Sequence, residues 1–183
     1  ITKGFCHTAL KIKKVNLPWG VMSGIRPAKN VREFYKSGLL KEQVRESLKN
    51  IYEVSDEKIE LSMTVAENEK KLLSEIEKNS VSIYIGIPFC PTRCLYCSFI
   101  SSDIKITGKY LNDFVRLLKE EIKKTKEVLD ECGLFVDNIY IGGGTPTTLD
   151  EEQLKELLLC VNKYFVSDKL KEFTLEAGRP DTI

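Results

Sequence analysis

The sequence changes its periodicity near Asn79, and this change constrains what the chain can fold into more than any other feature. After Asn79, short segments alternate apolar and polar residues, as strands do, and the segments between them carry apolar residues at helical spacing. This order of strands and helices predicts an α/β fold with parallel strands and crossover helices, although three strands do not close a barrel. The expected segments are, in order, the strand 81–87, the helix 111–122, the strand 136–141, the helix 154–161 and the strand 173–176.

The part of the chain before Asn79 has helical spacing instead. Pro27 suits the first turn of one helix, and Ser55 suits the N-cap of another, which we expect to reach Ile76. Apolar spacing over 44–51 indicates a helix between them, and we interpret 11–17 as a short strand. We therefore divide the chain into a mainly helical N-terminal region, residues 1–79, and an α/β region, residues 80–183.

Charge and hydrophobicity argue against two classes of partner. The 183 residues include 28 basic and 27 acidic side chains, a net charge of +1, without the basic excess that nucleic acid or an anionic lipid surface selects. No apolar run approaches the ~20 residues that span a bilayer, and no signal peptide opens the chain. We therefore expect a cytoplasmic protein with no nucleic-acid or membrane partner. Because the chain begins with Ile1, we expect it to be a fragment.

Three of the six cysteines stand together just after the first expected strand. Cys90, Cys94 and Cys97 are close enough in sequence for their thiolates to converge on one inorganic centre. Iron–sulfur clusters are held by cysteine thiolates, and a cubane has four irons. Three ligands leave one iron with an open position, which is what separates reactive from structural metal sites. The spacing therefore indicates an iron–sulfur site that lacks one protein ligand.

Other interpretations of these cysteines stay open from the residues alone. Structural zinc needs four ligands, and the only histidine, His7, lies in the other region. Cys94 and Cys97 alone have the spacing of a redox pair that follows a strand. Unrelated core thiols are disfavoured, because Pro91 and Arg93 are typical of a loop.

The cysteines and several further motifs resemble those of a known family. Their Cys-x3-Cys-x2-Cys spacing resembles the signature of the radical S-adenosylmethionine superfamily. Within it, residues 84–90 (YIGIPFC), 142–147 (GGGTPT) and 176–181 (EAGRPD) resemble the oxygen-independent coproporphyrinogen III oxidase family. Residues 17–20 (LPWG) and 24–27 (GIRP) resemble its coproporphyrinogen dehydrogenase branch. The resemblance runs across nearly the whole chain.

This resemblance implies a fold and two cofactors. Residues 80–183 would form the N-terminal half of a radical S-adenosylmethionine (βα)6 barrel, truncated at Ile183. Cys90, Cys94 and Cys97 would hold a four-iron, four-sulfur (4Fe-4S) cluster, and S-adenosylmethionine would bind beside it. The positions that match the family's S-adenosylmethionine contacts are Tyr84, Tyr96, Gly143, Gly144, Thr145 and Glu176.

Taken without the resemblance, these positions have plainer interpretations. The glycines also suit a strand-to-helix turn or a phosphate loop, although the lysine of the Walker pattern is absent. Tyr84 also suits a core aromatic, and Glu176 a surface carboxylate. Arg93 and Arg179 are candidates for binding the propionate arms of a porphyrinogen, because guanidinium pairs with carboxylates in a bidentate way. Arg93 also suits a plain loop cation.

The resemblance also implies radical chemistry on a tetrapyrrole. In that family the cluster, reduced by a donor such as flavodoxin or ferredoxin, cleaves S-adenosylmethionine, and the resulting radical starts the decarboxylation of a propionate of coproporphyrinogen III. Two positions depart from well-studied oxidases: Phe99 replaces a fourth cysteine, and Gly86 replaces a common histidine. Haem-binding chaperones of the family share both changes. We favour the oxidase because of the N-terminal motifs, keep the haem chaperone as the alternative, and expect this fragment alone to be inactive.

Overall fold

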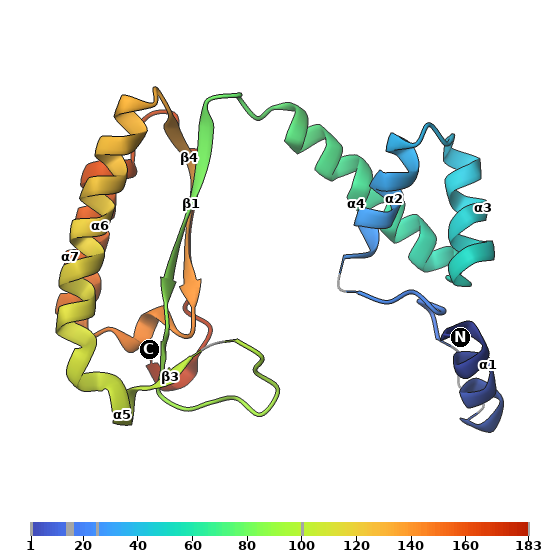
Figure 1. Ribbon diagram of the computed structural model, residues 1–183, viewed down its shortest axis with the longest axis horizontal. Coiled ribbons are helices and arrows are strands. Elements are labelled where there is room, and N and C mark those ends of the chain that lie inside the picture. The colour runs from blue at the N-terminus through green and yellow to red at the C-terminus, as the bar shows by residue number, and fades with distance from the viewer. Residues whose placement is uncertain (1, 14–16, 25, 100, 183) are drawn as a thin grey trace. The chain divides into compact units, whose positions relative to one another are not determined.

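The computed structural model describes residues 2–13, 17–24, 26–99 and 101–182 (Figure 1). The chain forms two compact units, Ile1–Ile76 and Glu77–Ile183. No helix in the described part of the chain is long and apolar enough to cross a membrane.

The described residues of the N-terminal unit are mainly helical. The helices are α1 (Thr2–Lys13), α2 (Pro27–Lys36), α3 (Lys41–Tyr52) and α4 (Asp56–Ser74). Residues from α2, α3 and α4 form the core, in which Val31, Val44 and Ile59 are fully buried. Ser55 caps α4 as predicted, because its hydroxyl accepts a hydrogen bond from the Lys58 amide at 3.4 Å. Apolar spacing and a local cap therefore build this unit.

Two sequence-based expectations for this unit are wrong. The strand expected over 11–17 is helical at its first three residues, which end α1, and Leu17 lies outside any helix or strand; residues 14–16 lie outside the described residues. Ala9 and Leu10 are strong helix formers, and they favour continuing the helix. The helix expected to reach Ile76 ends at Ser74, whose hydroxyl donates to a carbonyl oxygen of the last turn.

A sheet of parallel strands forms the centre of the second unit. Its strands, in spatial order, are β1 (Ser80–Ile87), β4 (Phe135–Gly143) and β5 (Glu172–Leu175). Tyr84 pairs with Tyr140, and Gly86 with Gly142, so equivalent positions of β1 and β4 lie side by side. The predicted parallel strands with crossover helices are confirmed.

Two long helices, α6 (Leu111–Glu131) and α7 (Glu151–Phe165), cover one face of this sheet (Figure 1). The predicted capping box starts α7: the Gln153 amide donates to the Asp150 carboxylate at 2.8 Å, and the Asp150 amide donates to the Gln153 side chain at 3.1 Å. One face of β1 and β4 and the facing sides of the helices are apolar, so the core lies between them. Its most buried members are Ile87, Ile139, Ile141, Leu157 and Val161.

A small parallel sheet brackets the cysteines, and the sequence did not predict it. Its two-residue strands are β2 (Phe89–Cys90) and β3 (Ser102–Asp103). Residues 91–99 between these strands are called the cysteine loop below. The remaining short elements are α5 (Ile104–Thr107), η1 (Gly108–Tyr110), η2 (Pro146–Thr148) and η3 (Pro180–Thr182).

Candidate functional site

The carboxyl ends of β1, β4 and β5 lie at the same edge of the sheet, and most predicted site residues follow them. The segment after β1 carries the three cysteines. The glycine turn (residues 142–145) closes β4, and Glu176 directly follows β5. The Gly144 amide donates to the Ile87 carbonyl oxygen at 2.8 Å, which fixes the glycine turn against the end of β1. Parallel strands place such sites at this edge.

Cys90 lies against the glycine turn in a buried position. Its exposed fraction is 7%, and the Thr145 hydroxyl, also buried, donates to its Sγ atom at 3.4 Å. A Cβ atom added to Gly144 would lie 2.9 Å from this sulfur and 2.7 Å from the Phe89 carbonyl oxygen. Gly143 has a φ of 112°, a conformation that L side chains rarely adopt. This side of the site therefore requires glycine and is set by close packing.

Cys94 and Cys97 lie in the cysteine loop and are partly buried. The Cys97 amide donates to the Cys94 carbonyl oxygen at 3.0 Å, which makes a turn between them. All three cysteines are free thiols. Tyr96 points into solvent with 90% of its surface exposed, so the structure does not bring it to the other candidates.

Tyr84 and Glu176 lie on the face of the sheet that α6 and α7 leave uncovered. Tyr84 is exposed, as its position opposite the buried isoleucines predicts, and its ring stacks on Tyr140 with centroids 5.9 Å apart. The Tyr140 hydroxyl donates a hydrogen bond to the Glu176 carboxylate. This hydrogen bond is the main cause that raises the pKa of Tyr140, and partial burial is the second. Gly142 leaves room for this contact, since an added Cβ would lie 2.7 Å from the Tyr140 ring.

Sequence reasoning missed Tyr140. A signal was present, because the tripeptide Tyr-Ile-Gly occurs at 84–86 in β1 and again at 140–142 in β4, in paired register. The contact with Glu176 depends on a third strand, which no local pattern reveals.

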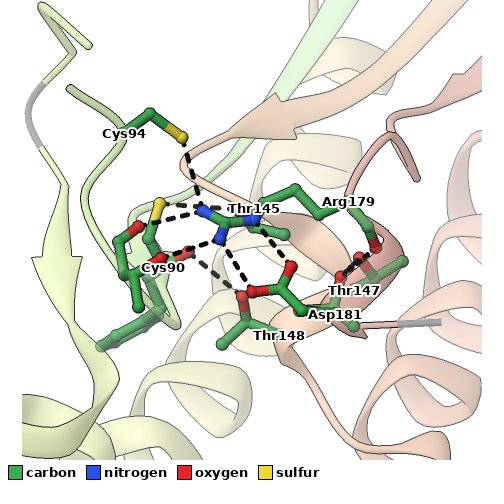
Figure 2. A network of polar contacts seen from close by, with 10 residues as sticks. Cys90, Cys94, Thr145, Thr147, Thr148, Arg179 and Asp181 are labelled. Carbon is green, nitrogen blue, oxygen red and sulfur yellow. Dashed lines mark hydrogen bonds and ion pairs between the residues drawn. The ribbon is translucent and has the colours of Figure 1, made fainter. Parts of the chain in front are cut away.

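Arg179 lies beside the cysteines and is held by residues that the sequence did not indicate. Its guanidinium forms an ion pair with Asp181 and also reaches Thr92 and Cys94 in the cysteine loop (Figure 2). The hydrogen bond and charge of Asp181 raise the pKa of Arg179, and the same contact lowers the pKa of Asp181. Arg93 is exposed, and none of the described polar contacts includes it.

The thiols at this edge fit an iron–sulfur cluster in kind. Three free cysteines supply the ligands, and the cradle at Gly144 holds no side chain that would obstruct Cys90. No three His, Cys, Asp or Glu side chains are close enough together to hold a metal anywhere in the described part of the chain. Binding a cluster therefore requires the cysteine loop to bring Cys94 and Cys97 towards Cys90.

In a comparison with protein families, the model described as the Radical SAM superfamily matches residues 84–182. This range includes the cysteine loop, the glycine turn and Glu176.

Among curated proteins, the oxygen-independent coproporphyrinogen-III oxidase-like protein HemZ of Bacillus subtilis strain 168 is 40% identical over 180 residues, 97% of this chain and 35% of that protein. The heme chaperone HemW of the same organism is 39% identical over 101 residues, 55% of this chain and 26% of its own length. The heme chaperone HemW of Lactococcus lactis strain IL1403 is 35% identical over 100 residues, 55% of this chain and 24% of its length. The chain thus spans about a third or less of these relatives, and no solved structure matches it.

Proposed function

Because this chain belongs to the radical S-adenosylmethionine superfamily, as its cysteine spacing indicated, we propose that Cys90, Cys94 and Cys97 hold a 4Fe-4S cluster. The observation that carries the proposal is the place of these free thiols, at the sheet edge where Gly144 makes room for Cys90. When bound, such a cluster supplies the electron that cleaves S-adenosylmethionine. The chain's own part is to hold three irons and to leave the fourth open.

We propose that S-adenosylmethionine binds on the uncovered face of the sheet, beside the glycine turn. The backbone of Gly143 and Gly144 can approach a ligand closely, because neither carries a side chain. Thr145 holds the turn to Cys90, and Glu176 presents a carboxylate to a cationic ligand group, oriented by Tyr140. Tyr84 and the exposed ring of Tyr96 are suited to stack on an aromatic ligand. These roles are proposals for all six positions.

For the whole protein we propose a tetrapyrrole substrate and an oxidative decarboxylation of coproporphyrinogen III. The relative that matches 97% of this chain is named as an oxidase-like protein, which supports this proposal over its alternative. The donor of electrons, flavodoxin or ferredoxin, and the cytoplasmic location stay predictions. So does the inactivity of this chain by itself.

A second function, haem binding and delivery, is favoured by a specific observation. Phe99 and Gly86 replace the cysteine and histidine of well-studied oxidases, and relatives matching just over half of this chain are named as heme chaperones. An anaerobic assay of the full-length protein with coproporphyrinogen III separates the two functions. Protoporphyrinogen formation supports the oxidase; tight haem binding without that product supports the chaperone.

The cluster itself is tested by iron and sulfide analysis after anaerobic reconstitution. We expect four irons and four sulfides per wild-type chain, with the broad visible absorption of a cluster. Cys94→Ala should lose most of both. Cys132→Ala is the matched control, because Cys132 is exposed at the end of α6 and should leave the content unchanged. Equal loading of Cys94→Ala and wild type would contradict the proposed ligands.

A further inference from the structure

The side chain of Arg179 uses every donor that it has. Arginine carries five N–H donors in a rigid planar fork. Nε donates to Asp181 Oδ1 at 3.0 Å, and Nη2 donates to Asp181 Oδ2 at 2.8 Å. Nη2 also donates to Thr92 Oγ1 at 2.8 Å, while Nη1 donates to the Thr92 carbonyl oxygen at 2.9 Å and to Cys94 Sγ at 3.6 Å. The fork therefore has five acceptors for five donors (Figure 2).

This full engagement bears on the role expected from the sequence. A propionate of a substrate needs two free donors for a bidentate contact. Arg179 has none left in this conformation, and its side chain is only 22% exposed. The guanidinium is therefore better placed to hold the protein together than to bind a substrate carboxylate here.

The residues that the guanidinium contacts belong to two different parts of the unit. Asp181 lies in η3, the turn after β5, and Thr182 anchors this turn. The Thr182 hydroxyl lies 2.6 Å from the Thr147 hydroxyl in η2. The Thr182 amide donates to the Arg179 carbonyl oxygen at 3.1 Å. Thr92 and Cys94 belong to the cysteine loop, far away in sequence. Arg179 is thus a cross-link between an anchored turn and a loop that has few other polar contacts.

We propose that Arg179 is a positioning residue that clamps the start of the cysteine loop to the turn after β5 and keeps a cationic N–H donor at the sulfur of Cys94 as the rest of that loop closes. This inference rests on the proposed cluster for its second part. Lysine cannot replace the clamp, because an ammonium group lacks the planar fork that spans Asp181 and Thr92. Hydrogen bonds to cluster sulfurs are among the factors that set a cluster's reduction potential, and a positive charge nearby favours the reduced form.

The clamp is tested first on the cluster-free protein by amide hydrogen exchange. The reporter is the Cys97 amide, which donates within the loop turn. Arg179→Lys and Arg179→Gln should speed its exchange on the order of tenfold, the effect of losing one charge-assisted hydrogen bond. Asp181→Asn should have a smaller effect in the same direction, because it leaves the Thr92 contacts. Arg93→Gln is the matched control, an exposed arginine of the same loop, and should exchange like wild type.

The second readout is the midpoint potential of the reconstituted cluster, titrated with dithionite, which delivers the one electron taken up, and followed by electron paramagnetic resonance. Arg179→Gln should lower the potential, because it removes the cation and its N–H donor from Cys94. Arg179→Lys should stay closer to wild type, since it keeps the charge. A purely structural role would not separate the two variants in this way.

The outcomes distinguish this inference from the proposed function. Faster exchange in both arginine variants with a lower potential in Arg179→Gln alone supports the clamp. Exchange at the wild-type rate in both variants overturns the clamp but does not bear on the proposed cluster. A wild-type protein that takes up no iron overturns the proposed cluster, and with it the proposed hydrogen bond to a cluster ligand. The hydrogen-exchange measurement on the cluster-free protein still tests the clamp.

Discussion

The glycine turn and the cysteine loop are the two sides of one candidate site, and they are held by different forces. The glycine turn lies against buried backbone, so closely that a Cβ on Gly144 would overlap the Phe89 carbonyl oxygen. The cysteine loop is held near its start by the fork of Arg179, and beyond Cys94 its side chains at Leu95, Tyr96 and Phe99 are exposed. The first side is preformed by packing. The second depends on polar contacts and would have to close around the proposed cluster.

The difference between the packed turn and the loop suits different functions. A rigid edge made of strand ends fixes the position of Cys90 and of the backbone that is proposed to meet S-adenosylmethionine. If the cysteine loop rearranges, the proposed cluster could enter before the remaining thiols bind it. Metal sites commonly gain part of their order from the metal itself. The comparison therefore predicts that substitutions on the packed side reduce stability, whereas substitutions in the loop affect cluster binding.

The largest expected effect is in the core under the packed side. Ile141→Ala removes a fully buried side chain of β4 and should lower the free energy of unfolding by about 2–5 kcal/mol. Leu95→Ala in the cysteine loop should change it by less than about 0.5 kcal/mol, because Leu95 is fully exposed. Urea unfolding followed by far-ultraviolet circular dichroism measures both. Similar losses in the two variants would remove the contrast between the two sides.

A smaller loss is expected in the glycine turn itself. Gly144→Ala forces a Cβ to within 2.7 Å of a backbone oxygen, and such overpacking should cost about 1–3 kcal/mol and reduce cluster loading. Gly178→Ala is the matched control, since a Cβ there meets nothing within 4 Å. Unfolding and iron content are measured together. If Gly144→Ala matched Gly178→Ala in both, close packing at the turn would not matter.

The loop side is tested by limited trypsin digestion. The bond after Arg93 lies in the exposed part of the cysteine loop. Cluster binding should slow its cleavage on the order of tenfold, which corresponds to a free energy of loop opening that is higher by about 1.4 kcal/mol. The bond after Lys169, in the exposed segment before β5, serves as the internal control. Cleavage after Arg93 that is equally fast with and without the cluster would argue against loop closure.

The smallest effect concerns pH and Tyr140. Its hydrogen bond to Glu176 favours the neutral phenol, which raises the pKa of Tyr140 above the ordinary value of 10.0. The stabilisation is therefore fully present below that value and is lost as pH rises through the raised pKa. Burial also raises the pKa of Tyr35, so an absorbance titration of tyrosinate should show late phenols, of which Tyr140→Phe removes one. Loss of an early-titrating phenol instead would contradict the hydrogen bond to Glu176.

The sequence predicted the parts of the fold that local patterns determine. Alternation placed Tyr84 on the uncovered face of β1, and the Asp150–Gln153 pair marked the start of α7. The two residues of β2 are too few for any periodicity, so that sheet was missed. At 11–17 the pattern was too short to decide between strand and helix.

The candidate site was predictable only as a set of residues. The cysteines, the glycines and Glu176 follow strand ends, which local patterns and the family motifs locate. Contacts between distant segments escaped this reasoning. The Tyr140–Glu176 hydrogen bond joins two strands, and the fork of Arg179 joins a turn to a loop 87 residues earlier in the chain. Such pairs depend on the assembled fold, so from the sequence Arg179 was only a candidate for binding a substrate carboxylate.

The central claim is that the two sides close around one cluster with an open iron that takes S-adenosylmethionine. Electron paramagnetic resonance of the reduced, reconstituted protein tests it most directly, recorded with and without S-adenosylmethionine. We predict a 4Fe-4S signal whose shape changes when S-adenosylmethionine is added, because an open iron gains a ligand. A signal that is identical in both samples, or no cluster signal at all, would contradict the claim.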